Sequence, residues 1–159
     1  MGSFFGSDDL KTAAEQPDLV DETRLIRRVT TITSTQVRTL NATPVSVVPA
    51  PGAGFFVEVD SVRVMLDYNS AAYDAVAGSG EDLSFKYTNA SGAKVTGDIA
   101  GSGFGDATAD AQRLVRGVAV TPVSNAAIVA HILSGEWYAA AGNSPLLVEV
   151  FYRVRRAQL

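Results

Sequence analysis

Hydrophobic and polar residues alternate along most of the chain after residue 28, and this alternation predicts β-strands. In one segment Leu83, Phe85 and Tyr87 share one side, while Ser84 and Lys86 share the other. A period of two is typical of strands that bury one face and leave the other toward solvent. The pattern marks nine candidate strands, at residues 29–38, 44–49, 54–60, 62–68, 82–89, 93–99, 114–121, 126–133 and 145–155.

Two segments depart from simple alternation. Between residues 54 and 68 the apolar parity changes from Phe55 and Val57 to Val62 and Val64. This change indicates either two strands or one strand with a bulge near Asp60-Ser61. Residues 126–133 are apolar on both parities, as expected of a central strand covered on both faces, although a short buried helix fits the same pattern.

Turn-forming residues separate most of the candidate strands, for example Ser91-Gly92, Ser134-Gly135 and the glycine-rich residues 101–105. The prolines and glycines of ATPVSVVPAPGAG, residues 42–54, suit a sheet edge followed by a turn. Many short strands with no long amphipathic helix after residue 28 predict an all-β domain over residues 29–159. We expect an antiparallel β-sandwich, jelly-roll-like in its strand count.

Residues 1–28 differ in composition and are expected to form an N-terminal arm, extended or partly helical. Its acids come early and its arginines late, so a short helix from Asp18 to Arg28 would match the helix dipole. Such a helix is marginal without a partner surface, and a tail with no fixed structure is the alternative. The arm residues expected to contact a neighbouring subunit or partner are Phe4, Phe5, Leu10, Leu19, Ile26, Arg24, Arg27 and Arg28.

Composition and charge narrow the classes of partner. The 159 residues, 47% of them hydrophobic, are enough to bury one core. The net charge of −4 offers no basic patch for phosphates, so no direct nucleic-acid binding is expected. The chain has no cysteine, which excludes disulfides and thiolate metal sites. Without a secretory signal or an apolar run of about 18 residues, a soluble protein with no membrane contact is expected.

Candidate chemistry is sparse. His131 is the only histidine and lies in an apolar run, so a structural role is expected; a Ser-His-Asp triad would need it as the base. Asp106 and Asp110 lie on the glycine-rich loop 101–110 and would offer oxygen ligands to calcium, but their spacing matches no recognised calcium loop. We therefore expect no metal site, no cofactor and no enzymatic activity.

Aromatic residues provide a different kind of candidate site. Trp137 and Tyr138 follow a turn and, together with Tyr68 and Tyr73, would make a platform for a sugar or a protein partner. The interpretation favoured by the pattern is that these rings fill the sandwich or its rim.

Two segments resemble small virion structural proteins of tailed bacteriophages. ATPVSVVPAPGAG is similar to the start of their compact β domain, and LLVEVFYRVR, residues 146–155, is similar to its last strand. The resemblance covers roughly residues 36–155. It implies a capsid decoration, or cement, protein made in the bacterial host cytoplasm and located on the outer capsid surface of the virion.

The same resemblance implies the partners. A decoration protein binds the major capsid protein as a homo-oligomer, expected here to be a trimer, and stabilises contacts between capsomers; the arm residues above would then contact the capsid or a neighbouring subunit. The alternative is a head-fibre or tail component that binds a host receptor or glycan, with Trp137 and Tyr138 as the contact residues.

Arginines close the last predicted strand. Arg153, Arg155 and Arg156 are expected to lie on a solvated edge strand, because charged side chains protect exposed strands from unwanted pairing. On a decoration protein the same arginines would make rim contacts with an acidic shell.

Overall fold

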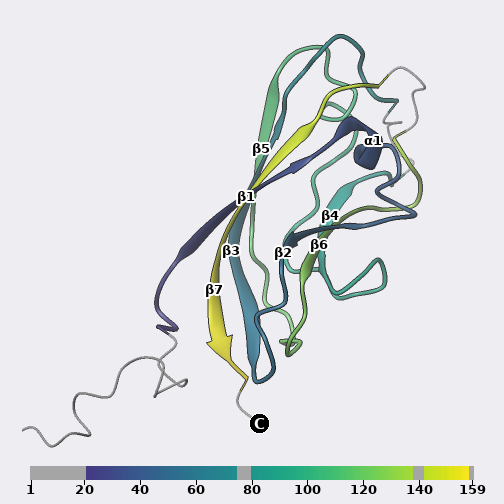
Figure 1. Cartoon of the computed structure of the whole chain (residues 1–159). Helices are drawn as coiled ribbons and strands as arrows, with labels where there is room; N and C mark the ends of the chain where they lie inside the picture. Colours follow the sequence, from purple (N-terminus) through teal and green to yellow (C-terminus); the bar gives the residue numbers. More distant parts are fainter. Residues whose placement is uncertain (1–20, 75–79, 138–141, 158–159) are drawn as a thin grey trace, which may run out of the picture.

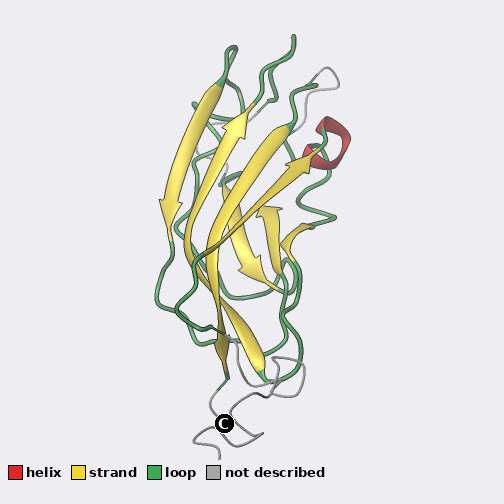
Figure 2. Cartoon of the chain, turned by 60° about the vertical axis from the view of Figure 1, so that its left-hand side comes forward, coloured by secondary structure: helices red, strands yellow, loops and turns green. Residues whose placement is uncertain are grey.

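The protein is a two-layer β-sandwich in the computed structural model, which describes residues 21–74, 80–137 and 142–157 (Figures 1 and 2). The first sheet has four antiparallel strands in the order β1 (Ile26–Ile32), β7 (Leu146–Arg156), β3 (Phe55–Leu66) and β5 (Ala111–Arg116). The second has three, in the order β2 (Val45–Val48), β6 (Ile128–Ile132) and β4 (Leu83–Tyr87). The predicted all-β sandwich is confirmed.

The strand predicted at residues 93–99 is not formed, and this segment meets β4 only through isolated bridges. The Val95 N–H donates to the Phe85 carbonyl at 2.9 Å, and Leu83 and Ile99 exchange two backbone hydrogen bonds of 2.9 Å. The segment therefore borders the edge of the second sheet at β4 without adding a fourth strand to it.

Alternating side chains from both sheets fill the core. Val64 and Val148 of the four-stranded sheet and Phe85 and Ile128 of the other sheet are fully buried. β6 pairs with β2 on one side and β4 on the other, and all its residues are buried, so the run around it is confirmed as a central strand and not a helix. Because the core sits between the layers, the function of this chain is most readily sought on the outer faces and at the ends of the sandwich.

The helix predicted to end at Arg28 is wrong over all of its described residues, since residues 21–25 are turn or irregular and residues 26–28 are strand. Ile26 pairs with Tyr152 and Arg28 pairs with Val150, so this part of the predicted arm belongs to β1. Pairing with β7 satisfies backbone groups that a short isolated helix would leave exposed at its ends. Residues 1–20, which include the start of the predicted helix, lie outside the described residues.

The strand predicted at residues 29–38 ends at Ile32 and is followed by the helix α1 (Ser34–Val37). The Gln36 N–H donates to the Thr33 Oγ1 at 3.3 Å, and the Thr33 N–H donates to the Gln36 Oε1 at 2.9 Å. This reciprocal pair is a capping box, which starts a helix by satisfying two free backbone donors. The Thr33-x-x-Gln36 spacing indicates a helix start, but the strand-like alternation of residues 29–38 runs across the same positions.

The parity change in residues 54–68 is a bulge within the single strand β3. The register of β3 against β7 shifts between Val59 and Ser61, so Asp60 is the extra residue. The strand predicted at 114–121 is instead β5, which begins at Ala111 and ends at Arg116. Beyond its end the Val118 N–H donates to the Val95 carbonyl at 3.0 Å, so the chain crosses to the other sheet there.

Candidate functional site

The side of the four-stranded sheet that points away from the core carries apolar and charged side chains together. Residues that alternate with the core valines of β3 and β7 point outward, because successive side chains of a strand lie on opposite faces. The strand register places them in three rows, which we call the outer face: Thr31, Leu147, Met65 and Gln112; Val29, Glu149, Arg63 and Leu114; Arg27, Phe151, Ser61 and Arg116.

Large apolar side chains of the outer face are open to solvent. Val29 is 47% exposed, Met65 45% and Leu114 52%, while Leu147 and Phe151 are half-buried between them. Each side chain would lose water contact if a partner covered this surface, and exposed apolar groups gathered on one face mark interaction sites.

The charges in the middle of the outer face are held in fixed positions. The Glu149 carboxylate forms ion pairs with Arg27 on β1 and with Arg63 on β3, the second at 3.1 Å. The Glu149 side chain is only 12% exposed, whereas Arg27 and Arg63 are 62% and 44% exposed. A carboxylate shared in this way orients two arginines whose outer edges still meet solvent.

Further ion pairs extend the outer face toward the C-terminal end of β7. The Arg153 guanidinium lies 3.6 Å from Asp60, and Arg155 donates two hydrogen bonds of 3.1 Å to Glu58. Those bonds raise the pKa of Arg155. β7 lies between β1 and β3, but its pairing with β1 ends at Tyr152. The arginines that follow therefore lie where β7 pairs only with β3, as expected of an edge, and there Arg153 and Arg155 pair with acids of β3.

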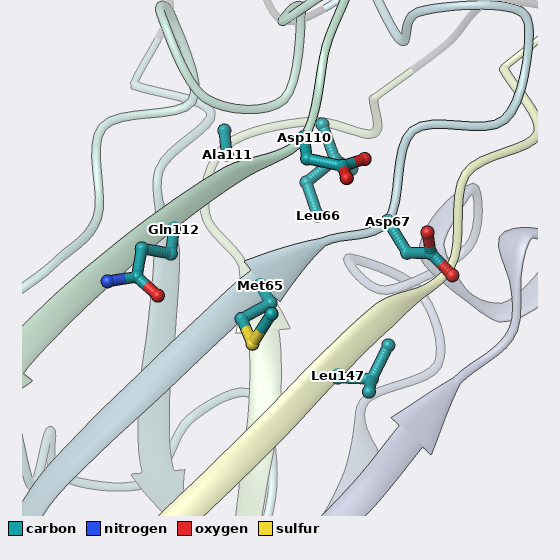
Figure 3. Close-up of a pocket in the computed structure, with 7 residues that line it drawn as sticks. All are labelled: Met65, Leu66, Asp67, Asp110, Ala111, Gln112 and Leu147. Carbon is teal, nitrogen blue, oxygen red and sulfur yellow. The ribbon is translucent and has the colours of Figure 1, made fainter.

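A pocket of about 450 Å³ lies where the outer face ends, beyond the last residues of β3 (Figure 3). Its apolar lining includes Met65, Leu66 and Leu147, and Asp67 and Asp110 lie at its polar end. The Asp110 Oδ1 accepts a hydrogen bond of 2.9 Å from the Tyr68 N–H. We call the large apolar residues of the outer face, Val29, Met65, Leu114, Leu147 and Phe151, the apolar strip. The pocket continues this strip at Met65 and Leu147 into a rim that carries carboxylates.

Trp137 is fully buried, so it presents no ring to a sugar or a receptor. Its indole N–H donates to the Glu81 carbonyl at 2.8 Å, and its ring centroid lies 6.0 Å from that of Tyr73 and 6.2 Å from that of Phe104. The interpretation of Trp137 as a core ring is confirmed, and its assignment as a receptor contact is wrong. Tyr138 lies outside the described residues.

Tyr73 is also buried and belongs to the same aromatic cluster. Its hydroxyl donates to the Ser144 carbonyl at 2.5 Å. Burial raises the pKa of Tyr73 to about 12, so the phenol stays protonated at neutral pH. Tyr68 is only half-buried, so the two tyrosines grouped with Trp137 occupy different environments.

The carboxylates of the glycine-rich loop bind the backbone. Asp106 Oδ1 accepts a hydrogen bond of 2.6 Å from the Gly103 N–H, whereas Asp110 binds Tyr68 as described above. The two acids thus hold different segments. Across residues 21–74, 80–137 and 142–157, no group of three or more acidic or histidine side chains is arranged to hold a metal ion.

His131 is 6% exposed and points to the side of the three-stranded sheet away from the core. It pairs with Ser84 of β4, and both His131 Nδ1 and Ser84 Oγ are buried without a hydrogen-bond partner. Burial, followed by the nearby charge of Lys86, lowers the pKa of His131. The imidazole is therefore neutral at pH 7 and enclosed by protein, which matches the expected structural position.

The predicted arm contacts fall in three places. Phe4, Phe5, Leu10 and Leu19 lie outside the described residues. Arg24 is exposed before β1, and Ile26 is half-buried against the core. Arg27 lies on the outer face, whereas Arg28 is exposed on the opposite side of β1, so the predicted arginines do not act together.

Several outer-face residues were missed as site candidates, among them Val29, Met65 and Leu114. The sequence of β7 could have indicated this face, because Leu147 and Phe151 are apolar at positions where an alternating strand would carry polar residues. Apolar residues at outward positions indicate a face that is covered by something else.

No described helix has the length and apolarity needed to cross a bilayer. In comparisons with known proteins, no protein-family model matches the chain. No curated protein matches it either.

Proposed function

We propose that this protein decorates the capsid of a tailed bacteriophage. In this proposal a homo-oligomer, a trimer, binds the major capsid protein on the outer surface of the head and stabilises contacts between capsomers. The observation that carries the proposal is the outer face, where Val29, Met65 and Leu114 are exposed beside oriented arginines. The resemblance of the two quoted segments to phage virion proteins supplies the kind of partner.

The physical mechanism is adhesion by many weak contacts. An apolar strip offers burial on any matching surface, at about 25 cal/mol for each square ångström removed from water. The arginines beside it, Arg27 and Arg63, favour an acidic partner and orient the contact. An oligomer that engages several capsomers at once gains avidity, because its later contacts form at high effective concentration.

The alternative, a head-fibre or tail component that binds a host receptor or glycan, has less support. It relied on Trp137 as a binding ring, and this indole is enclosed with its N–H bonded to Glu81. An exposed aromatic ring is what sugar recognition would use.

A sedimentation experiment tests the proposal. Purified protein is mixed with tailless phage heads that lack it, the heads are pelleted, and bound copies per head are counted. We expect saturation at hundreds of copies, with a number that indicates the symmetry axis occupied. The variant Leu114→Asp should lose at least tenfold in affinity, while Val123→Asp, a similar change at an exposed loop position, should not. Binding of a few copies or none would overturn the proposal.

A further inference from the structure

The outer face has a composition that calls for an acidic, apolar partner. Three of the large apolar side chains exposed on the described residues, Val29, Met65 and Leu114, lie on it. The charged groups on and beside these rows are five arginines and three carboxylates: Arg27, Arg63, Arg116, Arg153 and Arg155, with Glu58, Asp60 and Glu149. The pocket rim at the other end of the face adds the carboxylates of Asp67 and Asp110. The excess of arginines therefore lies toward the C-terminal end of β7, on a chain whose net charge is −4.

The N-terminal segment of the chain has the complementary composition. Residues 1–20 contain four carboxylates and one lysine. They also contain the apolar side chains Phe4, Phe5, Leu10 and Leu19. Opposite charges across an interface fix its register and speed its formation, and the aromatic rings supply the area to be buried.

The length of the segment suits the surface. Twenty extended residues span about 65 Å. The longest strand of the outer face, β3, has 12 residues and is therefore about 40 Å long. A single arm is long enough to leave one subunit and cross the outer face of another.

The described residues next to this segment already bind the β7 arginines. The Arg153 Nε donates to the Thr23 carbonyl at 3.3 Å, and Glu22 lies 3.9 Å from Arg156. Residue 21, where the described chain begins, therefore lies near the C-terminal end of β7. The arm emerges beside one outer face with the charge needed to pair with such a face.

We propose that residues 1–20 of one copy pack across the outer face of a neighbouring copy. Phe4, Phe5 and Leu10 cover the apolar strip around Leu114, and the carboxylates of the arm lie over the arginines. The choice of a neighbouring copy rests on the proposed function, because an arm folded onto its own sheet would join no subunits. The outer face is then the contact between subunits of the decoration oligomer, and Leu114→Asp would weaken binding to heads through the loss of the oligomer's avidity.

The natural absence of cysteine allows a direct test on the full chain without phage heads. Tagged Leu114→Cys protein is mixed with untagged Phe5→Cys protein under mild oxidation, and the mixed disulfide is measured on gels. The control replaces the tagged partner by Ala93→Cys, an exposed position beside β4. We expect at least tenfold more mixed disulfide with Leu114→Cys than with the control.

Two results would overturn the inference. Equal yields with Leu114→Cys and Ala93→Cys would show that the arm has no preference for the outer face. A Phe5→Cys/Leu114→Cys double variant that forms its disulfide within one chain, with no mixed disulfide in the two-variant experiment, would place the arm on its own subunit. Both disulfide experiments use the protein alone. The inference about the arm can therefore be overturned while binding to heads is observed, and binding to heads can be absent while the arm contact is found.

A second measurement tests how much the arm and the outer face contribute to the affinity between copies. The self-association constant, obtained by sedimentation equilibrium, should weaken at least tenfold in Leu114→Asp and in a variant that lacks residues 1–20. Val123→Asp should associate as the parent does, because Val123 is exposed on a loop away from the outer face. Unchanged association of the arm-deleted variant would contradict the inference.

Discussion

Replacing Trp137 by alanine distinguishes a core ring from a binding ring. The side chain is fully buried, its N–H is bonded to the Glu81 carbonyl at 2.8 Å, and Tyr73 and Phe104 pack around it. The backbone of Gly105 also packs directly against the indole, since a Cβ at this position would lie 2.9 Å from the ring. Removing the ring leaves a cavity that these rigid neighbours cannot easily fill.

The magnitude follows from the burial. An aromatic side chain buries about 150–250 Å², which corresponds to about 4–6 kcal/mol of transfer free energy at about 25 cal/mol per Å². Large-to-small substitutions of buried aromatics cost about 3–5 kcal/mol when measured. We expect Trp137→Ala to lower the free energy of unfolding by about 4 kcal/mol. Trp137→Phe keeps part of the aromatic ring system and should cost about 2 kcal/mol, from the smaller ring and the lost hydrogen bond between the indole N–H and the Glu81 carbonyl.

Urea unfolding followed by far-UV circular dichroism measures both changes, because Trp137 is the only tryptophan and its fluorescence is lost in the variants. With a denaturant slope of about 2 kcal/mol per molar, the midpoint of Trp137→Ala should fall by about 2 M. A loss below about 1 kcal/mol, or a smaller loss than in Trp137→Phe, would refute the packing argument.

Three other expectations concern backbone packing, a buried carboxylate and the histidine. Gly117→Ala should cost about 2 kcal/mol in urea unfolding, because its Cβ would lie 1.9 Å from a backbone oxygen, while Gly97→Ala, with no atom within 4 Å of its Cβ, should change stability little. Glu136→Gln should cost about 2 kcal/mol, since its carboxylate accepts two backbone hydrogen bonds of 2.8 Å from the loop after α1; a thermal melt unchanged from the parent would contradict this. Burial lowers the pKa of His131, so below about pH 6.5 the unfolded chain takes up more protons than the folded one and the free energy of unfolding decreases as the pH is lowered. In a series of unfolding curves at different pH, His131→Gln should reduce this decrease. The same pH dependence in His131→Gln and in the parent would show that His131 is not its cause.

The sequence determined the class of fold and the direction of most side chains. Alternation such as Leu83, Phe85 and Tyr87 places one set in the core whatever the partner strands are, because successive side chains of a strand point to opposite faces. The same local rule marked the parity change near Asp60-Ser61 and the double-sided run around Ile128, but the structure was needed to show that the first is a bulge within one strand and the second a strand.

Two elements were not predicted, the helix α1 and the first residues of β1, because the local sequence signals there conflict or are weak. At Thr33 two signals conflict, since the alternation continues while the capping spacing to Gln36 starts a helix. Tertiary pairing decides the stretch from Ile26 to Arg28, because a short segment with weak preferences takes the conformation of its neighbour strand.

Only the tertiary structure decided which outward residues form a surface. Val29, Met65 and Leu114 are far apart in the sequence and come to lie on one face because β1, β3 and β5 belong to the same sheet as β7. Strand order is set by which cores and turns fit together, and no local pattern encodes it. The burial of Trp137 follows from the same cause, since the loops that enclose it come from distant parts of the chain.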